Sequence, residues 1–228
     1  MTRPHTRPSH ERTTRATGLT IAAAICALGY LAICARPATE VRSLLKTAAV
    51  MLLAIAAGLS GASWLLVAAL ALCAVGDWML LRDSDGAFMA GVGAFAAGHL
   101  VYVVLFITHP LADPARWSVM PQPLFIFALL ALGLGMAWLL MPRAGDLQGP
   151  VLGYIPIILA MGLAVLVLEP LGAVRFALPA ALLFVMSDLI LASEKFLLRP
   201  GHPAEAATPY VVWTTYWLAQ FGFLVAFT

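Results

Sequence analysis

Two aspartates interrupt long apolar stretches of this sequence, and each of them directly follows a small residue. Asp77 lies in AVGDWMLL (residues 74–81), and Asp188 lies in VMSDLILA (residues 185–192). Placing an ionisable side chain at the depth of a membrane helix costs roughly 2.5–3.5 kcal/mol, so such side chains usually face a bundle interior or a wet cavity. We therefore interpret Asp77 and Asp188 as candidate catalytic residues, with helix packing through a polar partner as the alternative.

Further polar side chains lie in the apolar stretches at spacings that group them. His99 and Tyr102 are three residues apart, and Tyr216 and Gln220 are four residues apart, so each pair shares one face of a helix. The pattern predicts a polar pocket near one membrane face. Interhelical hydrogen bonding and snorkelling of lysines to the interface are the alternatives. The candidate substrate-binding residues are Lys46, His99, Tyr102, Tyr154, Ser187, Lys195, Tyr216 and Gln220.

The composition places these side chains in a membrane protein. Of the 228 residues, 62% are hydrophobic and only 11% are charged, and the mean hydropathy is +0.95. A soluble domain carries about 25% charged residues, so the composition excludes an ordinary soluble domain. The three cysteines show no metal-ligand or disulfide spacing, and we expect no metal and no other cofactor.

Eight apolar segments are long enough to cross a bilayer, which needs roughly 20 residues. Short polar connections separate them, and none is long enough to bury a core of its own. We predict an all-α polytopic integral membrane protein with about eight transmembrane helices. Residues 1–17, which contain four arginines, are predicted to be a disordered basic cytoplasmic tail, and residues 18–228 a single transmembrane domain. The expected helices cover residues 18–35, 43–59, 62–81, 87–108, 121–141, 149–168, 172–193 and 209–227.

The helix order also predicts where the two aspartates lie. Asp77 is near the end of the third segment and Asp188 is near the end of the seventh. Odd-numbered helices cross the membrane in the same direction, so both carboxylates should lie at a similar depth on the same side. The similarity of the two stretches suggests a four-plus-four internal repeat. The N-terminal arginines place both termini in the cytoplasm, and we expect a multi-pass protein of a bacterial inner membrane.

Several stretches resemble those of the YhhN-type membrane family, which includes the lysoplasmalogenases. The resemblance covers about residues 43 to 224. The family often has a Lys-Pro pair where this chain has Lys46 followed by Thr47. That difference puts in doubt any role of a kink there. The matching stretches, in order, are GDWMLL, GAFAAGHLVY, YIPIILAM, LFVMSDLILASEKF and TYWLAQ.

This resemblance implies an eight-helix enzyme that hydrolyses the vinyl ether bond of lysoplasmalogen. The products would be a fatty aldehyde and glycerophosphoethanolamine or glycerophosphocholine. The two aspartates of the family correspond to Asp77 and Asp188. The implied partners are a lysophospholipid substrate and membrane lipid, and no nucleic acid.

The implied reaction suits two carboxyl groups in unlike surroundings. It begins with proton transfer to the β-carbon of the vinyl ether, which gives an oxocarbenium ion that water then attacks. One carboxylic acid supplies the proton, and one carboxylate stabilises the cation and activates water, as in glycosidases. The sequence leaves open which aspartate has which role. We expect the lipid phosphate to find donors among the polar side chains named above.

Three other interpretations fit the same residues. Intramembrane acids and a four-plus-four repeat are also found in small proton-coupled transporters. A non-catalytic membrane scaffold would use the aspartates for helix packing alone. A hydrolase acting on another lysolipid would keep the fold and the carboxylates but change the substrate.

Overall fold

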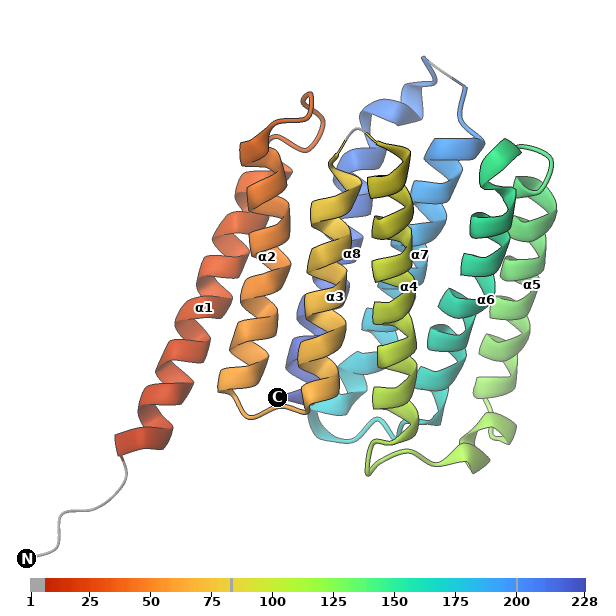
Figure 1. The fold of residues 1–228 in the computed structure, drawn as a ribbon. Helices are drawn as coiled ribbons and strands as arrows, with labels where there is room; N and C mark the ends of the chain where they lie inside the picture. Colours follow the sequence, from red (N-terminus) through yellow and green to blue (C-terminus); the bar gives the residue numbers. More distant parts are fainter. Residues whose placement is uncertain (1–6, 83, 200) are drawn as a thin grey trace, which may run out of the picture.

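The structure is a computed structural model that describes residues 7–82, 84–199 and 201–228. The described residues form eight α-helices joined by short turns and 3-10 segments. Figure 1 shows the helices side by side with their long axes roughly aligned, and the start of the first helix and the C-terminus lie at the same end of the bundle. The helices are α1 (Arg7–Leu31), α2 (Glu40–Leu59), α3 (Trp64–Leu80), α4 (Asp85–Ile107), α5 (Gln122–Leu140), α6 (Gln148–Ala164), α7 (Ala177–Phe196) and α8 (Thr208–Phe227).

The helices have the length and composition of membrane spans. Seven of them are long and apolar enough to cross a bilayer when the 3-10 turns adjoining α6 and α7 are included, while α3, with 17 residues, is a shorter apolar helix. At 1.5 Å per residue α3 is about 26 Å long, slightly less than the hydrocarbon core of a typical bilayer. The predicted all-α polytopic integral membrane protein is confirmed.

The first helix begins earlier than the sequence pattern predicted. We expected residues 1–17 to be disordered, but α1 already begins at Arg7; residues 1–6 lie outside the described part of the chain. Local contacts explain the extension. Arg15 pairs with Glu11 one turn away at 2.6 Å, and the Thr17 hydroxyl donates to the carbonyl of Thr13. Of these two contacts, the ion pair between side chains at positions i and i+4 stabilises the first turns of the helix.

The connection between α6 and α7 also differs from the prediction. The expected helices 149–168 and 172–193 each lose a few residues to 3-10 turns, η3 (Val165–Val167) and η4 (Gly172–Phe176). Gly172 has a φ of +53°, a conformation that favours glycine. A short antiparallel contact ties this connection to the α4–α5 loop, since the amide of Asp113 donates to the carbonyl of Val167. Both loops lie at the end of the bundle that holds the termini (Figure 1).

Helices α3 and α4 approach each other closely through glycines. A Cβ atom on Gly76 would lie 2.6 Å from the ring of Phe95, and one on Gly98 would lie 2.9 Å from the sulfur of Cys73. Neither position has room for a larger side chain. The close approach brings Asp77, which follows Gly76, against the helix that carries His99. The predicted face of α4 with Phe95, His99 and Tyr102 is buried, as expected.

Helix α8 packs across the bundle and is tied to the first two helices. The indole of Trp213 donates to the carbonyl of Ala27 at 3.0 Å, and that of Trp217 donates to the carbonyl of Ala49 at 3.2 Å. Indole N–H groups usually find a partner when they are buried. These bonds fix the rotation of α8, so that Tyr216 is buried and faces Asp77.

Candidate active site

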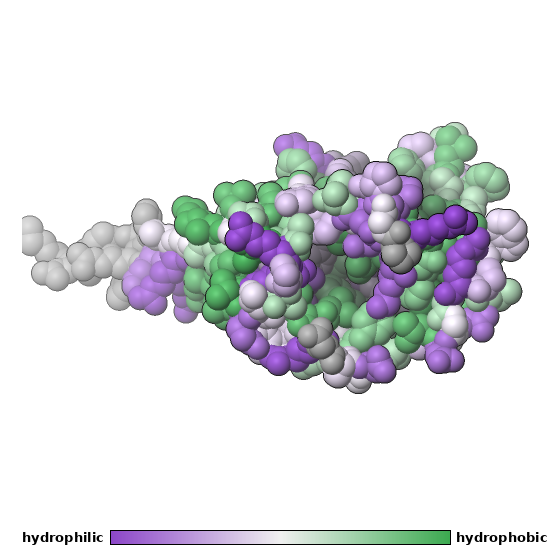
Figure 2. All heavy atoms as spheres, turned by 90° about the horizontal axis from the view of Figure 1, so that it is seen from above, coloured by the Kyte–Doolittle hydropathy of each residue, from purple (hydrophilic) through white to green (hydrophobic). Residues whose placement is uncertain are grey.

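A cavity of about 390 Å³ opens at the end of the bundle opposite the termini. Side chains from all eight helices line it, including residues near the start of α2, α4, α6 and α8 and near the end of α3, α5 and α7. Figure 2 shows this face of the molecule hollowed, with hydrophilic residues gathered around the hollow. Small-molecule sites typically have volumes of about 300–1,000 Å³, so the cavity is large enough to bind part of a lipid.

Asp77 lies in the wall of this cavity with a cation and a hydroxyl as neighbours. Its side chain has no exposed surface. Its Oδ1 atom is 3.0 Å from the ammonium nitrogen of Lys46, and its Oδ2 atom accepts a hydrogen bond from the hydroxyl of Tyr216 at 2.7 Å. A charge buried in a protein needs such a partner. The pair thus joins a fully buried carboxyl group to a half-buried ammonium group.

Asp188 lines the same cavity but has different neighbours. Its Oδ2 atom accepts a hydrogen bond from the hydroxyl of Tyr154 at 2.7 Å and lies 3.6 Å from Nε2 of His99. Within the described part of the chain, no lysine or arginine lies at ion-pair distance. The side chain is 17% exposed, whereas that of Asp77 is fully buried. Asp188 is thus the carboxyl group more open to a ligand.

The hydrogen bonds of His99 define which of its nitrogens carries a proton. Its Nδ1 atom lies 2.7 Å from the backbone carbonyl of Phe95, and a carbonyl oxygen only accepts hydrogen bonds. Nδ1 therefore donates, and in a neutral imidazole Nε2 is then left as an acceptor. Nε2 is buried, has no hydrogen-bond partner among the described residues, and is the ring nitrogen nearest to Asp188.

Seven of the ten predicted site residues line the cavity, and three do not. The two aspartates are joined there by Lys46, Tyr154, Ser187, Lys195 and Tyr216. The hydroxyl of Ser187 donates to the carbonyl of Val212 at 3.1 Å, so this bond ties α7 to α8.

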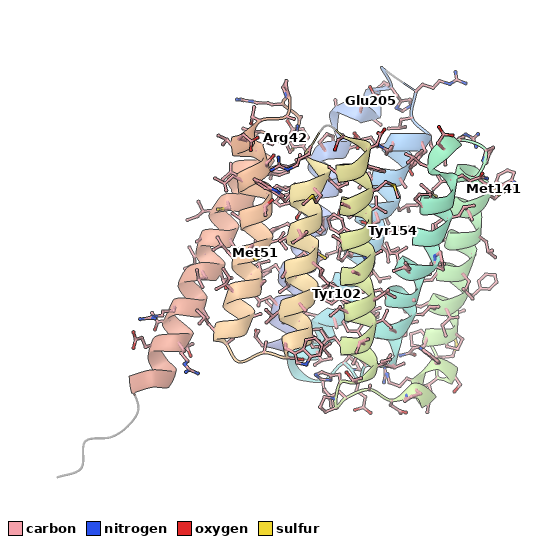
Figure 3. All side chains as sticks on the ribbon, in the orientation of Figure 1. Arg42, Met51, Tyr102, Met141, Tyr154 and Glu205 are labelled. Atoms are coloured by element: carbon pink, nitrogen blue, oxygen red, sulfur yellow. The ribbon has the colours of Figure 1, made fainter. Side chains whose placement is uncertain are left out.

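The other three predicted residues, His99, Tyr102 and Gln220, lie behind the cavity wall. The Tyr102 hydroxyl donates to Oε1 of Gln220 at 2.6 Å, and both side chains are fully buried. Figure 3 shows Tyr102 farther than Tyr154 from the end of the bundle that carries Arg42. The pair therefore joins α4 to α8 below the cavity, which is the interhelical bonding weighed as the alternative.

The sequence pattern missed three polar residues of the cavity, Tyr30, Arg42 and Glu194. Arg42 lies one helical turn before Lys46 on the same face of α2, and Glu194 directly precedes Lys195. Arg42 could have been identified from its position one helical turn before Lys46, which was already a candidate. Tyr30 lies against both α2 cations, with each charged group 5.9 Å from its ring centroid.

The fold and the cavity define a multi-pass membrane protein with two aspartates at one site, one fully buried and one half-buried. The chain belongs to the YhhN family, whose model matches residues 41–227. All the cavity residues except Tyr30 lie in that range. The match confirms the resemblance drawn from the sequence motifs.

The chain is also similar to a human protein, lysoplasmalogenase TMEM86B. The two are 34% identical over 161 residues, which is 70% of this chain and 62% of the human protein. The matched region thus spans less than two thirds of the length of that relative. No solved structure matches the chain.

Proposed function

We propose that the protein is a lysoplasmalogenase-type hydrolase that cleaves the vinyl ether bond of a lysoplasmalogen. The products are a fatty aldehyde and glycerophosphoethanolamine or glycerophosphocholine. One observation carries the proposal: the carboxyl groups of two intramembrane aspartates line a single cavity, and only one of the two is paired with a lysine. Membership of the YhhN family and the similarity to human lysoplasmalogenase TMEM86B support the same activity.

Asp188 is the proton donor in this proposal. The acceptor nitrogen Nε2 of His99 is the ring nitrogen nearest to its carboxyl group. A lone pair is repelled by a carboxylate and attracted by the O–H of a carboxylic acid. The distance of 3.6 Å also exceeds the 2.7–2.9 Å typical of a hydrogen bond between an imidazolium and a carboxylate. The arrangement therefore favours a carboxylic acid at Asp188 and a neutral His99.

Asp77 is the carboxylate that stabilises the cation and activates water. Its charge is balanced by Lys46 and its Oδ2 atom is held by Tyr216, so it is fixed before the substrate binds. A fixed negative charge in a site that excludes water is an effective stabiliser of developing positive charge. Paired carboxyl groups of unequal protonation divide acid and base roles in this way in other hydrolases.

The proposed reaction moves protons among the lipid, one water molecule and the two aspartates. The carboxylic acid of Asp188 protonates the β-carbon of the vinyl ether, and the electron pair of the double bond forms the new C–H bond. Asp77 stabilises the resulting oxocarbenium ion and accepts a proton from the water that attacks it. The hemiacetal hydroxyl then gives its proton to the carboxylate of Asp188 as the bond to the glycerol oxygen breaks, and the aldehyde leaves. Asp77 returns its proton to the glycerol oxygen, so both carboxyl groups regain their starting protonation states.

The cavity also offers an apolar wall for the single hydrocarbon chain of such a lipid. Val92 of α4, Val151 and Ile155 of α6, and Leu191 of α7 line it together with the polar residues. Burying each CH₂ group stabilises the bound state by about 0.8 kcal/mol. A lipid bound with its chain along these residues would place its glycerol portion near the carboxyl groups.

The orientation of the protein follows as a second part of the proposal. If the termini lie in the cytoplasm of a bacterial inner membrane, the cavity opens to the periplasm, because it lies at the other end of the bundle. A membrane-impermeant maleimide should then label His202→Cys in intact cells and label Thr228→Cys only after lysis. The reverse pattern would show that the cavity faces the cytoplasm.

The test of the activity is aldehyde release from a lysoplasmalogen by the purified protein. We expect the wild-type protein to release aldehyde, and Asp77→Asn and Asp188→Asn to insert and fold but turn over at least about a hundredfold more slowly, since removing a general acid or base costs 10²–10⁴-fold. Asp85→Asn is the matched control, because Asp85 is exposed at the start of α4 and does not line the cavity.

Wild-type rates in either site variant would contradict the two-carboxylate mechanism. A folded wild-type protein that releases no aldehyde would contradict the proposed substrate. Product formed instead from a saturated ether or an ester lysolipid would then assign the protein to a different class of lipid hydrolase.

A further inference from the structure

Three charged side chains at the mouth of the cavity have no ion-pair partner in the described part of the chain. They are Arg42 of α2 and the neighbouring Glu194 and Lys195 of α7. Lys46, which we expected to be a ligand of the lipid phosphate, is instead paired with Asp77 at 3.0 Å. The mouth therefore presents two cations and one carboxylate that remain available to a ligand.

Arg42 is held in place but keeps unused donors. One of its terminal nitrogens donates to the backbone carbonyl of Arg36 at 2.6 Å, and its guanidinium lies over the ring of Tyr30. Its Nε atom is buried and has no hydrogen-bond partner among the described residues. A guanidinium offers five N–H donors in a geometry that matches a phosphate. A buried donor without a partner is destabilising, and a bound phosphate would satisfy it.

We propose that Arg42, Lys195 and Glu194 form a subsite for a zwitterionic lipid headgroup. Arg42 and Lys195 bind the phosphate, and Glu194 binds the cationic ethanolamine or choline group. The inference rests on the proposed function for the choice of a lysophospholipid as the ligand. The ammonium group of Lys195 lies 4.0 Å from the ring centroid of Phe88, so the second cation is also positioned at the mouth.

The spacing between this subsite and the carboxyl groups fits the substrate. Arg42 lies one turn beyond Lys46 and Lys195 lies two turns beyond Asp188, which places them about 6 and 10 Å farther along their helices at 1.5 Å per residue. In a lysoplasmalogen, seven bonds separate the vinyl β-carbon from phosphorus. At roughly 1.2 Å of extension per bond, as in an extended chain, that is about 8 Å. A phosphate at the mouth therefore leaves the vinyl ether at the depth of the carboxyl groups.

The experiment measures binding of saturated ether lipids, which lack the double bond that the reaction needs. The three probes are 1-O-hexadecylglycerophosphocholine, 1-O-hexadecylglycerol 3-phosphate and uncharged 1-O-hexadecylglycerol, and native mass spectrometry compares their affinities for each variant. We expect Arg42→Gln and Lys195→Gln each to weaken binding of both phosphate lipids by about tenfold, since one hydrogen bond to a charged group accounts for a change of that size. Neither variant should change binding of hexadecylglycerol.

Glu194→Gln should have a narrower effect. It should weaken binding of the phosphocholine lipid by about threefold or more. The phosphate monoester has no cationic group, so the variant should bind it at least as tightly as the wild-type protein does. Arg82→Gln is the matched control, because Arg82 is a cation near the same end of the bundle but does not line the cavity. Its guanidinium lies 4.3 Å from the ring centroid of Trp78. This control variant should bind all three lipids as the wild-type protein does.

Equal losses for all three lipids, or no loss for the phosphate lipids in Lys195→Gln, would overturn the proposal. Lys195→Gln decides the matter if Arg42→Gln does not fold, because Lys195 is exposed. These results do not depend on turnover. A wild-type protein that selects the phosphate lipids but releases no aldehyde from lysoplasmalogen would keep the subsite and reject the proposed reaction.

Discussion

Asp77 and Asp188 occupy matching places in the fold but have neighbours of different chemistry. Each lies in the second half of its helix, after a small residue, and each contacts one side chain from the preceding helix. For Asp77 that side chain is Lys46 of α2, and for Asp188 it is Tyr154 of α6. The comparison shows that the scaffold supplies two similar positions with different neighbours: an ammonium group lies beside Asp77, and no lysine or arginine of the described residues lies at ion-pair distance from Asp188.

The second neighbour of each aspartate extends the same relation. Asp77 accepts a hydrogen bond from Tyr216 of α8, and Asp188 lies near His99 of α4. If α1–α4 and α5–α8 were the two halves of a repeat, each aspartate would contact the last helix of the other half. The contacts agree with this arrangement, and the four-plus-four repeat stays a prediction.

The largest expected difference between the two positions concerns stability. Lys46→Met removes the cation from a fully buried carboxylate, and breaking a buried ion pair in this way costs about 3–5 kcal/mol. We expect its free energy of unfolding in mixed micelles to fall by that amount. Lys46→Met combined with Asp77→Asn should recover most of the loss, because no unpaired charge remains.

Lys195→Met is the control for this measurement. Lys195 is exposed, so its replacement by methionine should change the free energy of unfolding by no more than about 0.5 kcal/mol. A Lys46→Met protein as stable as this control would show that Asp77 is not held as a carboxylate by Lys46. The distinction between the two aspartates would then be lost.

A smaller difference is expected from the two tyrosines. Tyr216 donates to the carboxylate of Asp77, and Tyr154 donates to Asp188 at the same distance of 2.7 Å. A hydrogen bond to a charged group contributes about 1.5–3 kcal/mol and a neutral one about 0.5–1.5 kcal/mol. Tyr216→Phe should therefore lower the free energy of unfolding more than Tyr154→Phe. Equal losses, or the opposite order, would contradict unequal protonation of the two carboxyl groups.

The fold was largely predictable, because the lengths of the apolar segments determine how many helices span a bilayer. The eight helices and most of their ends follow from those segments and from the short polar connections. The start of α1 was not predictable from hydropathy, since it depends on local pairs such as Glu11 with Arg15. The 3-10 turns before α7 were missed because residues 172–176 are joined without a break to the apolar stretch of α7, and hydropathy does not distinguish a 3-10 turn from an α-helix.

The site was predictable in its residue types but only partly in its contacts. The intramembrane aspartates stood out because their burial is costly, and both line the cavity. Helical spacing shows which face a side chain occupies but not which helix lies opposite. It therefore grouped Tyr102 and Gln220 with the cavity, although they bind each other below it. Arg42 was missed because a cation near a helix end also has the pattern of a snorkelling side chain.

In the proposed mechanism Asp188 holds a proton while Asp77 is ionised, and infrared spectroscopy of the carboxyl carbonyl band distinguishes these two states. Difference spectra between the wild-type protein and each Asp→Asn variant at neutral pH would show which side chain is a carboxylic acid. We expect the band of a protonated carboxyl group to disappear in Asp188→Asn and to persist in Asp77→Asn and in the control Asp85→Asn. Loss of that band in Asp77→Asn instead, or its persistence in both site variants, would rule out this assignment of the proton.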